Sequence, residues 1–172
     1  MSNEIATWPK KSIPMVFLIL AFFALMSRID YIVNGTLYSY GLRFSYDWAE
    51  GYWSTYFSVY VVFSIVVASA YWLGSNKTRT NLKYSIALFL TIILLAAGGV
   101  QDIMFFIFWA GGLPPSSVVW WWAPWTSLIG TWNSILQITA TSLVCCAIIF
   151  IWIQATKKQN RSSVVLDETL SI

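Results

Sequence analysis

LKYSIALFLTIILLAAGGVQDIMFFIFW, residues 82–109, is the stretch that decides the fold. As one straight helix at about 1.5 Å per residue it would be ~42 Å long, which exceeds a hydrocarbon core of about 30 Å. Such a helix must tilt, or its end must leave the membrane and pack against the outer loops. The small residues AAGG at 96–99 allow close helix packing or a kink, and the glycines and prolines of 111–115 end the helix.

Three further apolar stretches predict a polytopic, all-α membrane protein, built as a four-helix transmembrane bundle with aromatic outer loops. The predicted spans are about 13–33, 53–73, 82–109 and 127–153. They form one transmembrane domain, 13–153, between a cytoplasmic tail at 1–12 and a disordered cytoplasmic tail at 154–172. Asn34-Gly35 predicts a turn in the first outer loop, and Ser45, followed by acidic residues, predicts that the second span begins early as an interfacial helix.

The charged residues orient this bundle. Hydrophobic residues make up 58% of the 172 residues and charged residues only 10%, whereas a soluble domain carries about 25% charge. Basic residues collect on one side of the alternating spans, and by the positive-inside rule that side is cytoplasmic. The protein is therefore expected in the cell (plasma) membrane as a multi-pass protein with both termini cytoplasmic. Eight basic residues fall on the inner side and two on the outer side: Lys10, Lys11, Lys77, Arg79, Lys83, Lys157, Lys158 and Arg161, against Arg28 and Arg43.

Much catalytic chemistry is excluded by composition. Histidine is absent, which removes the commonest general base and metal ligand. Cys145 and Cys146 are neighbours in the fourth span and point about 100° apart, so we interpret them as small buried residues rather than a redox or metal pair. No nucleophile elbow, phosphate-binding glycine loop or nucleic-acid patch occurs. The sequence therefore predicts no catalytic residue, no cofactor, no metal and no nucleic-acid partner.

Polar residues at the ends of the apolar spans form the candidate intramembrane site. Gln101 and Asp102 stand near the outer end of the third span, where a carboxylate is costly unless it is paired or reaches water. Arg28 is the expected partner, for which Asp30 competes, and this favours an ion pair tying the first and third spans. The alternatives are a proton or cation site that also uses Glu50, or simple exposure at the interface. The candidate set is Arg28, Asp30, Gln101, Asp102, Asn133 and Gln137.

The fourth span carries two polar or small-residue patterns. Thr126, Gly130 and Ser134 recur at four-residue spacing, which would let a neighbouring helix approach closely. Asn133 and Gln137 lie on an adjoining stripe, where amides usually hydrogen-bond between helices. A substrate pathway is the alternative interpretation of these two amides.

Tryptophans are concentrated on the outer half of the predicted bundle. Eight of the eleven lie there, more than aromatic belts at both faces require. We interpret them as an interfacial anchor and loop core, with a protein docking surface or a ligand-stacking pocket as alternatives. The candidate interface residues are Trp109, Trp120, Trp121, Trp122, Trp125 and Gly130.

Two segments carry a general resemblance to known proteins. DYIVNGTLYSYGLRFSYDWAEGYW at 30–53 and QDIMFFIFWAGGLP at 101–114 resemble small uncharacterised four-span membrane proteins of prokaryotes, especially archaea. In size, span count and lack of histidine the chain is also similar to accessory subunits of membrane-bound ammonia and methane monooxygenases. The copper-binding subunits of that family use histidine-rich sites, from which this chain departs, so no functional residue is carried over.

These observations favour a non-catalytic structural or accessory subunit of a larger integral-membrane complex, such as a membrane monooxygenase. Its expected partners are membrane lipids and other membrane protein subunits. The alternative is a small transporter or channel subunit that uses Asp102, Gln101 and the polar residues of the fourth span. A second alternative is a membrane lipid-modifying enzyme that uses the outer carboxylates.

Overall fold

The computed structural model describes residues 8–42 and 46–157, and this part of the chain is helical without strands, as predicted. Four helices are long and apolar enough to cross a membrane, and two are short. The long helices are α1 (Trp8–Ser39), α2 (Tyr46–Leu73), α3 (Arg79–Ala97) and α6 (Ser134–Thr156), and the short ones are α4 (Val100–Phe108) and α5 (Thr126–Ile129). Most of the two predicted tails lies outside the described residues.

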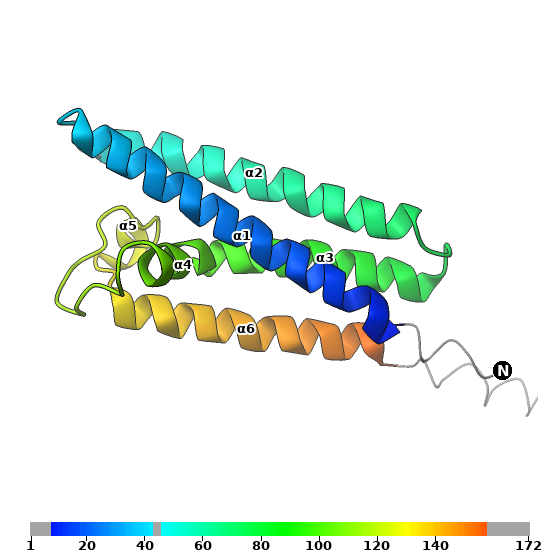
Figure 1. The fold of residues 1–172 in the computed structure, drawn as a ribbon. Coiled ribbons are helices and arrows are strands. Elements are labelled where there is room, and N and C mark those ends of the chain that lie inside the picture. The colour runs from blue at the N-terminus through cyan, green and yellow to red at the C-terminus, as the bar shows by residue number, and fades with distance from the viewer. Residues whose placement is uncertain (1–7, 43–45, 158–172) are drawn as a thin grey trace, which may run out of the picture.

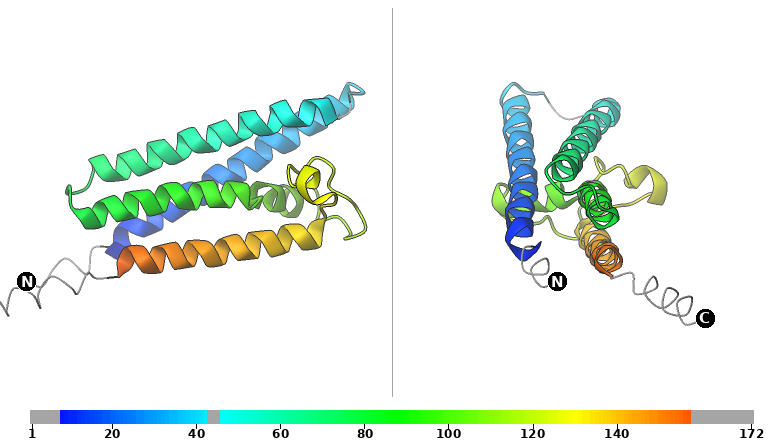
Figure 2. Two further views of the ribbon diagram at one scale, coloured as in Figure 1. Left: turned by 180° about the vertical axis from the view of Figure 1, so that it is seen from behind. Right: turned by 90° about the vertical axis from the view of Figure 1, so that its right-hand side faces the viewer.

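α2, α3 and α6 run along one common axis (Figure 1). α3 lies between α2 and α6 and packs against both, while α1 crosses diagonally and packs against α4. Both described ends of the chain and the 74–78 connection lie at one end of the bundle (Figures 1 and 2). We call the opposite end, which holds α4, α5 and residues 109–133, the aromatic end.

The first span is longer than predicted, because Asn34-Gly35 does not form a turn. The Asn34 amide donates to the backbone oxygen of Asp30 at 3.0 Å and to its Oδ1 at 2.8 Å, so this side chain is satisfied within the helix. α1 continues instead to Ser39, and Gly41, whose φ is 73°, follows two residues later. There Leu42 N donates to Leu37 O at 3.0 Å, a closing bond that suits a left-handed glycine. α2 begins at Tyr46, close to its predicted start.

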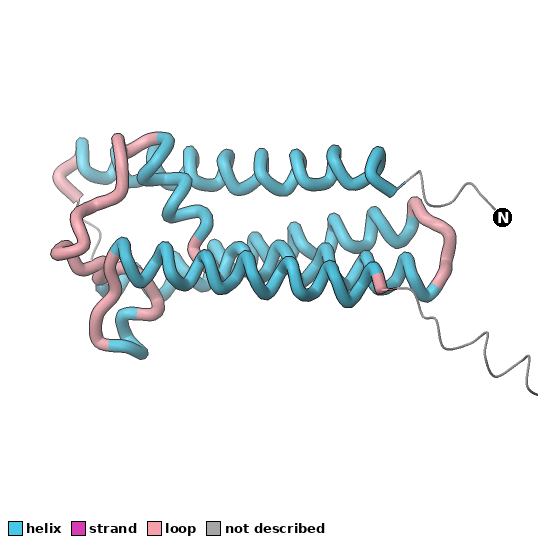
Figure 3. The backbone as a smooth tube through the Cα atoms, turned by 90° about the horizontal axis from the view of Figure 1, so that it is seen from below, coloured by secondary structure: helices cyan, strands magenta, loops and turns pink. Residues whose placement is uncertain are grey.

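The range 82–109 forms two helices rather than one. α3 stops at Ala97, and Gly99 takes the left-handed conformation with φ 66°. After this break α4 turns out of the bundle direction and crosses toward α1 (Figure 3). The excess length of the third stretch is therefore accommodated by a break at the predicted small residues.

The fourth span begins later than predicted. Gly130, with φ 80°, ends α5, and the Asn133 side chain caps α6 by accepting from Ile135 N and Leu136 N, each at 3.1 Å. Thr126, Gly130 and Ser134 therefore do not share one helix, and the predicted seam of small residues is wrong.

The prediction that Cys145 and Cys146 are buried is also wrong, because both are exposed. α6 packs against α3 and α4, so most of its circumference, which includes these two cysteines, faces away from the bundle. In a membrane this surface would meet lipid or another protein.

Side chains of α1, α2 and α3 form the main core. The rings of Phe22 and Phe63 stack with centroids 3.6 Å apart. Ser85 Oγ donates to Ala68 O at 2.7 Å and ties α3 to α2. Because lipid tails are as apolar as these side chains, close packing and such hydrogen bonds hold the helices together in a membrane, rather than burial from water.

Candidate functional site

The break between α3 and α4 is held by an amide from α6. Gln137 is 1% exposed, and its Nε2 donates to Gly98 O at 2.7 Å. Its Oε1 accepts from Trp132 Nε1 at 2.8 Å. Thr141 Oγ1 also donates to Gly98 O, at 2.5 Å. The carbonyl freed by the break is therefore satisfied by α6, as an interrupted helix in a membrane requires. The predicted interhelical hydrogen bond of Gln137 is present, whereas Asn133 serves only as a helix cap.

The break places Gln101 and Asp102 in the interior of the aromatic end, where they are 3% and 7% exposed. Gln101 Nε2 donates to Asp30 Oδ2 at 3.2 Å, and Gln101 Oε1 accepts from the Tyr60 hydroxyl. The Tyr52 hydroxyl donates to Asp30 Oδ1. Together with Asn34, these side chains give Asp30 three donors and connect α1, α2 and α4 through one network.

Asp102 stands beside this network without belonging to it. No hydrogen bond or ion pair joins its carboxylate to any other side chain in the described part of the chain. α4 follows the third membrane-crossing helix, which ends at Ala97, and is not itself one of the four spans. Burial raises the pKa of Asp102 to about 8, and the nearby charge of Asp30 raises it as well. The site therefore holds a carboxylate that lacks a counter-charge.

The predicted ion pair between Arg28 and Asp102 does not form. Arg28 is exposed on a face of α1 that points away from the buried Asp30, and its guanidinium lies over the ring of Trp109, 4.7 Å from the centroid. Trp109 is fixed in turn by its Nε1, which donates to Ser27 Oγ at 3.0 Å. Asp30 lies two residues from Arg28, on a different face of the helix, and points inward. α1 and α4 are therefore tied by the Asp30–Gln101 hydrogen bond instead of by an ion pair.

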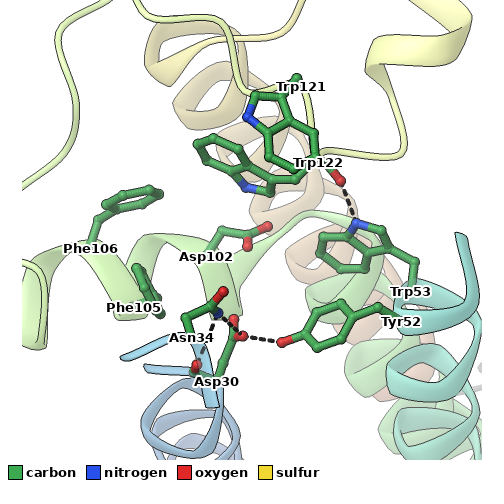
Figure 4. Close-up of a pocket in the computed structure, with 9 residues that line it drawn as sticks. All are labelled: Asp30, Asn34, Tyr52, Trp53, Asp102, Phe105, Phe106, Trp121 and Trp122. Atoms are coloured by element: carbon green, nitrogen blue, oxygen red, sulfur yellow. Dashed lines mark hydrogen bonds between the residues drawn. The ribbon is translucent and has the colours of Figure 1, made fainter. Parts of the chain in front are cut away.

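A cavity of about 300 Å³ opens beside Asp102. In Figure 4 the Asp102 side chain lies between Trp121 and Trp122 on one side and the Asp30–Asn34 pair on the other. A second cavity, of about 360 Å³, is lined by Gln101, Gln137 and Gly99, and it shares Asp102 and Trp53 with the first. Trp53 Nε1 donates to Trp122 O and so bridges α2 to the loop above. The first cavity is lined by Asp30, Asn34, Tyr52, Trp53, Asp102, Phe105, Phe106, Trp121 and Trp122.

The tryptophans of the candidate interface pack mainly against their own chain. Trp120 is 0% exposed and stacks against Trp122 with centroids 5.7 Å apart. Trp125 packs against Trp132 at 6.2 Å, whereas Trp121 is 39% exposed and lines the first cavity. Gly130 is exposed at the end of α5. These residues thus build a loop core with an aromatic cavity under it.

Four of the six predicted polar residues line or adjoin the two cavities, namely Asp30, Gln101, Asp102 and Gln137. Arg28 and Asn133 do not. Sequence reasoning missed the tyrosines that complete the network, although they carry a signal. Tyr52, Tyr56 and Tyr60 are spaced four apart and therefore share one face of α2.

Comparison with known proteins finds no match to this chain, neither a protein-family model nor a curated protein nor a solved structure.

Proposed function

We propose that this protein binds a cation in the cavity at its aromatic end and passes it across the membrane, as a small transporter or channel subunit. The observation that carries this proposal is Asp102, a buried carboxylate that lacks a partner and lines two adjoining cavities. A charge in such a place is costly unless it meets an opposite charge. A cation entering the cavity would supply one.

The surroundings of Asp102 support a positively charged ligand. Of the described side chains, none of those lining either cavity is basic. Asp30 adds a second carboxylate to the first cavity. An anion would therefore meet repulsion there. The second cavity continues from Asp102 toward the break at Gly99, where interrupted helices of transporters commonly place their ion and substrate sites.

The charge distribution of the sequence supports an orientation. The 74–78 connection and the described chain ends lie opposite the aromatic end, and the basic residues concentrate beside them. We propose that this basic side faces the cytoplasm of a plasma membrane, so that the cavity opens to the outside.

Uptake by proteoliposomes tests this function. The full chain is reconstituted, an inside-negative potential is imposed, and entry of Na⁺, Rb⁺ and tetramethylammonium is followed. At least one of the three should enter faster than into protein-free vesicles, and Asp102→Asn should remove the difference. Trp72→Leu, at the opposite end of the bundle, is the control and should leave uptake unchanged. If none of the three cations enters in an Asp102-dependent way, the proposal is wrong.

An accessory role in a larger membrane complex is the second candidate, favoured by the surface of α6. Leu143, Ile149 and Phe150 are 67%, 59% and 61% exposed, and they offer a broad apolar face to other membrane subunits. Native mass spectrometry of gently extracted protein tests this role. A defined complex with another subunit would support it, and a lone chain would contradict it.

A further inference from the structure

We propose that the cavity of about 300 Å³ beside Asp102 selects a small alkylammonium group, preferably a quaternary one, over inorganic cations. This inference rests on the proposed cation-binding function and names its ligand class. The lining of this cavity is aromatic around a single available carboxylate.

The lining supplies few oxygen ligands. Asp30 already accepts from three donors, and this leaves Asp102 as the carboxylate that is open to a ligand. The described residues contain no group of three or more acidic or cysteine side chains that could hold a metal ion. Hard cations such as Ca²⁺ need six to eight oxygens, and Mg²⁺ needs an octahedron of them. The cavity is therefore poorly suited to strip water from an inorganic ion.

Aromatic rings dominate the rest of the lining. Five of the nine lining residues are tryptophan or phenylalanine: Trp53, Phe105, Phe106, Trp121 and Trp122. The face of such a ring attracts a cation with ~0.5–1 kcal/mol at exposed sites and about 2 kcal/mol or more when the cation is desolvated. The same chain already places the Arg28 guanidinium 4.7 Å from the centroid of the Trp109 ring. Several rings around one cation constitute the arrangement that proteins use to recognise quaternary ammonium groups.

Hydration and size favour the alkylated cation. An alkylammonium group carries its charge on an apolar shell, which loses little hydration on entering an aromatic cavity. The volume of about 300 Å³ lies at the lower limit of small-molecule pockets, which run from about 300 to 1,000 Å³. It therefore fits a small head group rather than a large ligand. The charge of Asp102 then fixes the position of the cation among the rings.

Two sources present the same chemistry, a free alkylamine in solution and the choline head group of a lipid. The aromatic end lies where the head groups of a bilayer would reach it if the four spans cross the membrane. The ligand class is the same in both cases, so the experiment needs an arm that separates them.

Calorimetric titration of the purified full chain in a maltoside detergent, which contains no amine, tests the ligand class. Choline and tetramethylammonium should bind at least tenfold more tightly than K⁺ and than 3,3-dimethylbutan-1-ol, the neutral isostere of choline. Equal binding of the neutral isostere, or of K⁺, would overturn the proposal. This comparison uses the unaltered protein and does not depend on the folding of any variant.

Four variants, one of them a control, assign the effect to the cavity. Asp102→Asn should weaken tetramethylammonium binding at least tenfold. Trp121→Leu should weaken it severalfold while Trp121→Phe, which keeps an aromatic face, retains most of it. Trp72→Leu lies at the opposite end of the bundle and should bind like the unaltered protein. Unchanged affinity in Asp102→Asn would place the ligand elsewhere and refute the site.

Nanodiscs separate the two sources. If lipid head groups occupy the cavity, tetramethylammonium should bind more weakly in phosphatidylcholine than in phosphatidylglycerol nanodiscs. Equal affinity in both lipids assigns the site to a free amine, and either result supports the ligand class. If Na⁺ or Rb⁺ passes in an Asp102-dependent way but tetramethylammonium does not bind, the ligand class is wrong and the cation function stands. If none of these cations binds or passes, both proposals fail.

Discussion

Gly99→Ala is the substitution for which the structure predicts the largest local effect. A Cβ at this position would lie 2.2 Å from Gln137 Nε2 and 2.8 Å from its Cδ, distances that a packed side chain cannot accept. Gly99 also has φ 66°, a conformation that costs an alanine ~1–2 kcal/mol. The substitution therefore strains the backbone and displaces Gln137 at the same time.

The magnitude follows from what Gln137 does. Its displacement breaks the bond to Gly98 O at 2.7 Å and the bond from Trp132 at 2.8 Å, each worth ~1 kcal/mol in net terms. With the backbone strain, the free energy of unfolding should fall by about 3 kcal/mol. On the scale of soluble domains of about 150–250 residues this is a loss of ~6–12 °C in melting temperature.

Thermal unfolding in detergent, followed by intrinsic tryptophan fluorescence, measures this loss. Gly35→Ala is the matched control, because Gly35 lies inside α1 and a Cβ there meets nothing within 4 Å. That control should be stabilising by ~0.5–1 kcal/mol. The double variant Gly99→Ala with Gln137→Ala should lose less stability than the two single variants summed, since the clash is then removed. If Gly99→Ala melts within about 2 °C of the unaltered protein, the account of the helix break is refuted.

Four further outcomes follow from the polar site, in which Asp102 faces Asp30 from α1 and Tyr52 and Tyr60 from α2. Asp102→Asn should raise the melting temperature at pH 7, because folding at that pH must otherwise protonate a carboxylate that is ionised in the unfolded chain, whereas an amide needs no proton; an unchanged or lower value would contradict this. The pKa of Asp102 is about 8 in the folded chain and near 3.8 in the unfolded chain. The contribution of Asp102 to stability is therefore fully present below pH 3.8 and is lost as pH rises toward 8. The melting temperature should therefore fall over that range, and less so in Asp102→Asn. The affinity for tetramethylammonium, which does not titrate, should rise about tenfold per pH unit between roughly pH 6 and 8 and then level off, because proton and cation compete for one carboxylate. Calorimetry at four pH values measures this dependence, and an affinity that did not change with pH would exclude the competition. Tyr60→Phe should cost ~1–3 kcal/mol in a denaturation series, because it leaves Gln101 Oε1 buried without its donor, and a neutral result would show that the hydroxyl is dispensable.

The four membrane-crossing helices could be predicted from the sequence because apolar length alone determines them. Their ends could not, because single side chains decide these. Asn34 continues α1 by bonding within the helix, whereas Asn133 begins α6 by capping it. The same residue type thus serves opposite purposes, and only its neighbours in space distinguish them.

Part of the site was also visible in the sequence. Polar groups beside apolar runs can be recognised as candidate site residues, because burying them in a membrane costs free energy. This signal identified Asp30, Gln101, Asp102 and Gln137. Their partners depend on the rotation of each helix. Arg28 lies only two residues from Asp30, yet it faces outward onto Trp109. The break at Gly99 then sets which way Gln101 and Asp102 point, and spacing along one continuous helix does not give that direction.

The saturation of Asp30 by its donors has a consequence for how the cavity responds to its contents. Tyr52, Asn34 and Gln101 come from three helices, and each is already committed to this one carboxylate. The floor of the cavity is thus preorganised when the chain folds, so a ligand arriving there need not immobilise it. Adaptation to ligands of different size then falls to the opposite wall, where the exposed Trp121 belongs to a loop. Asp102 sets which charge is accepted, and the loop that carries Trp121 sets how large the ligand can be.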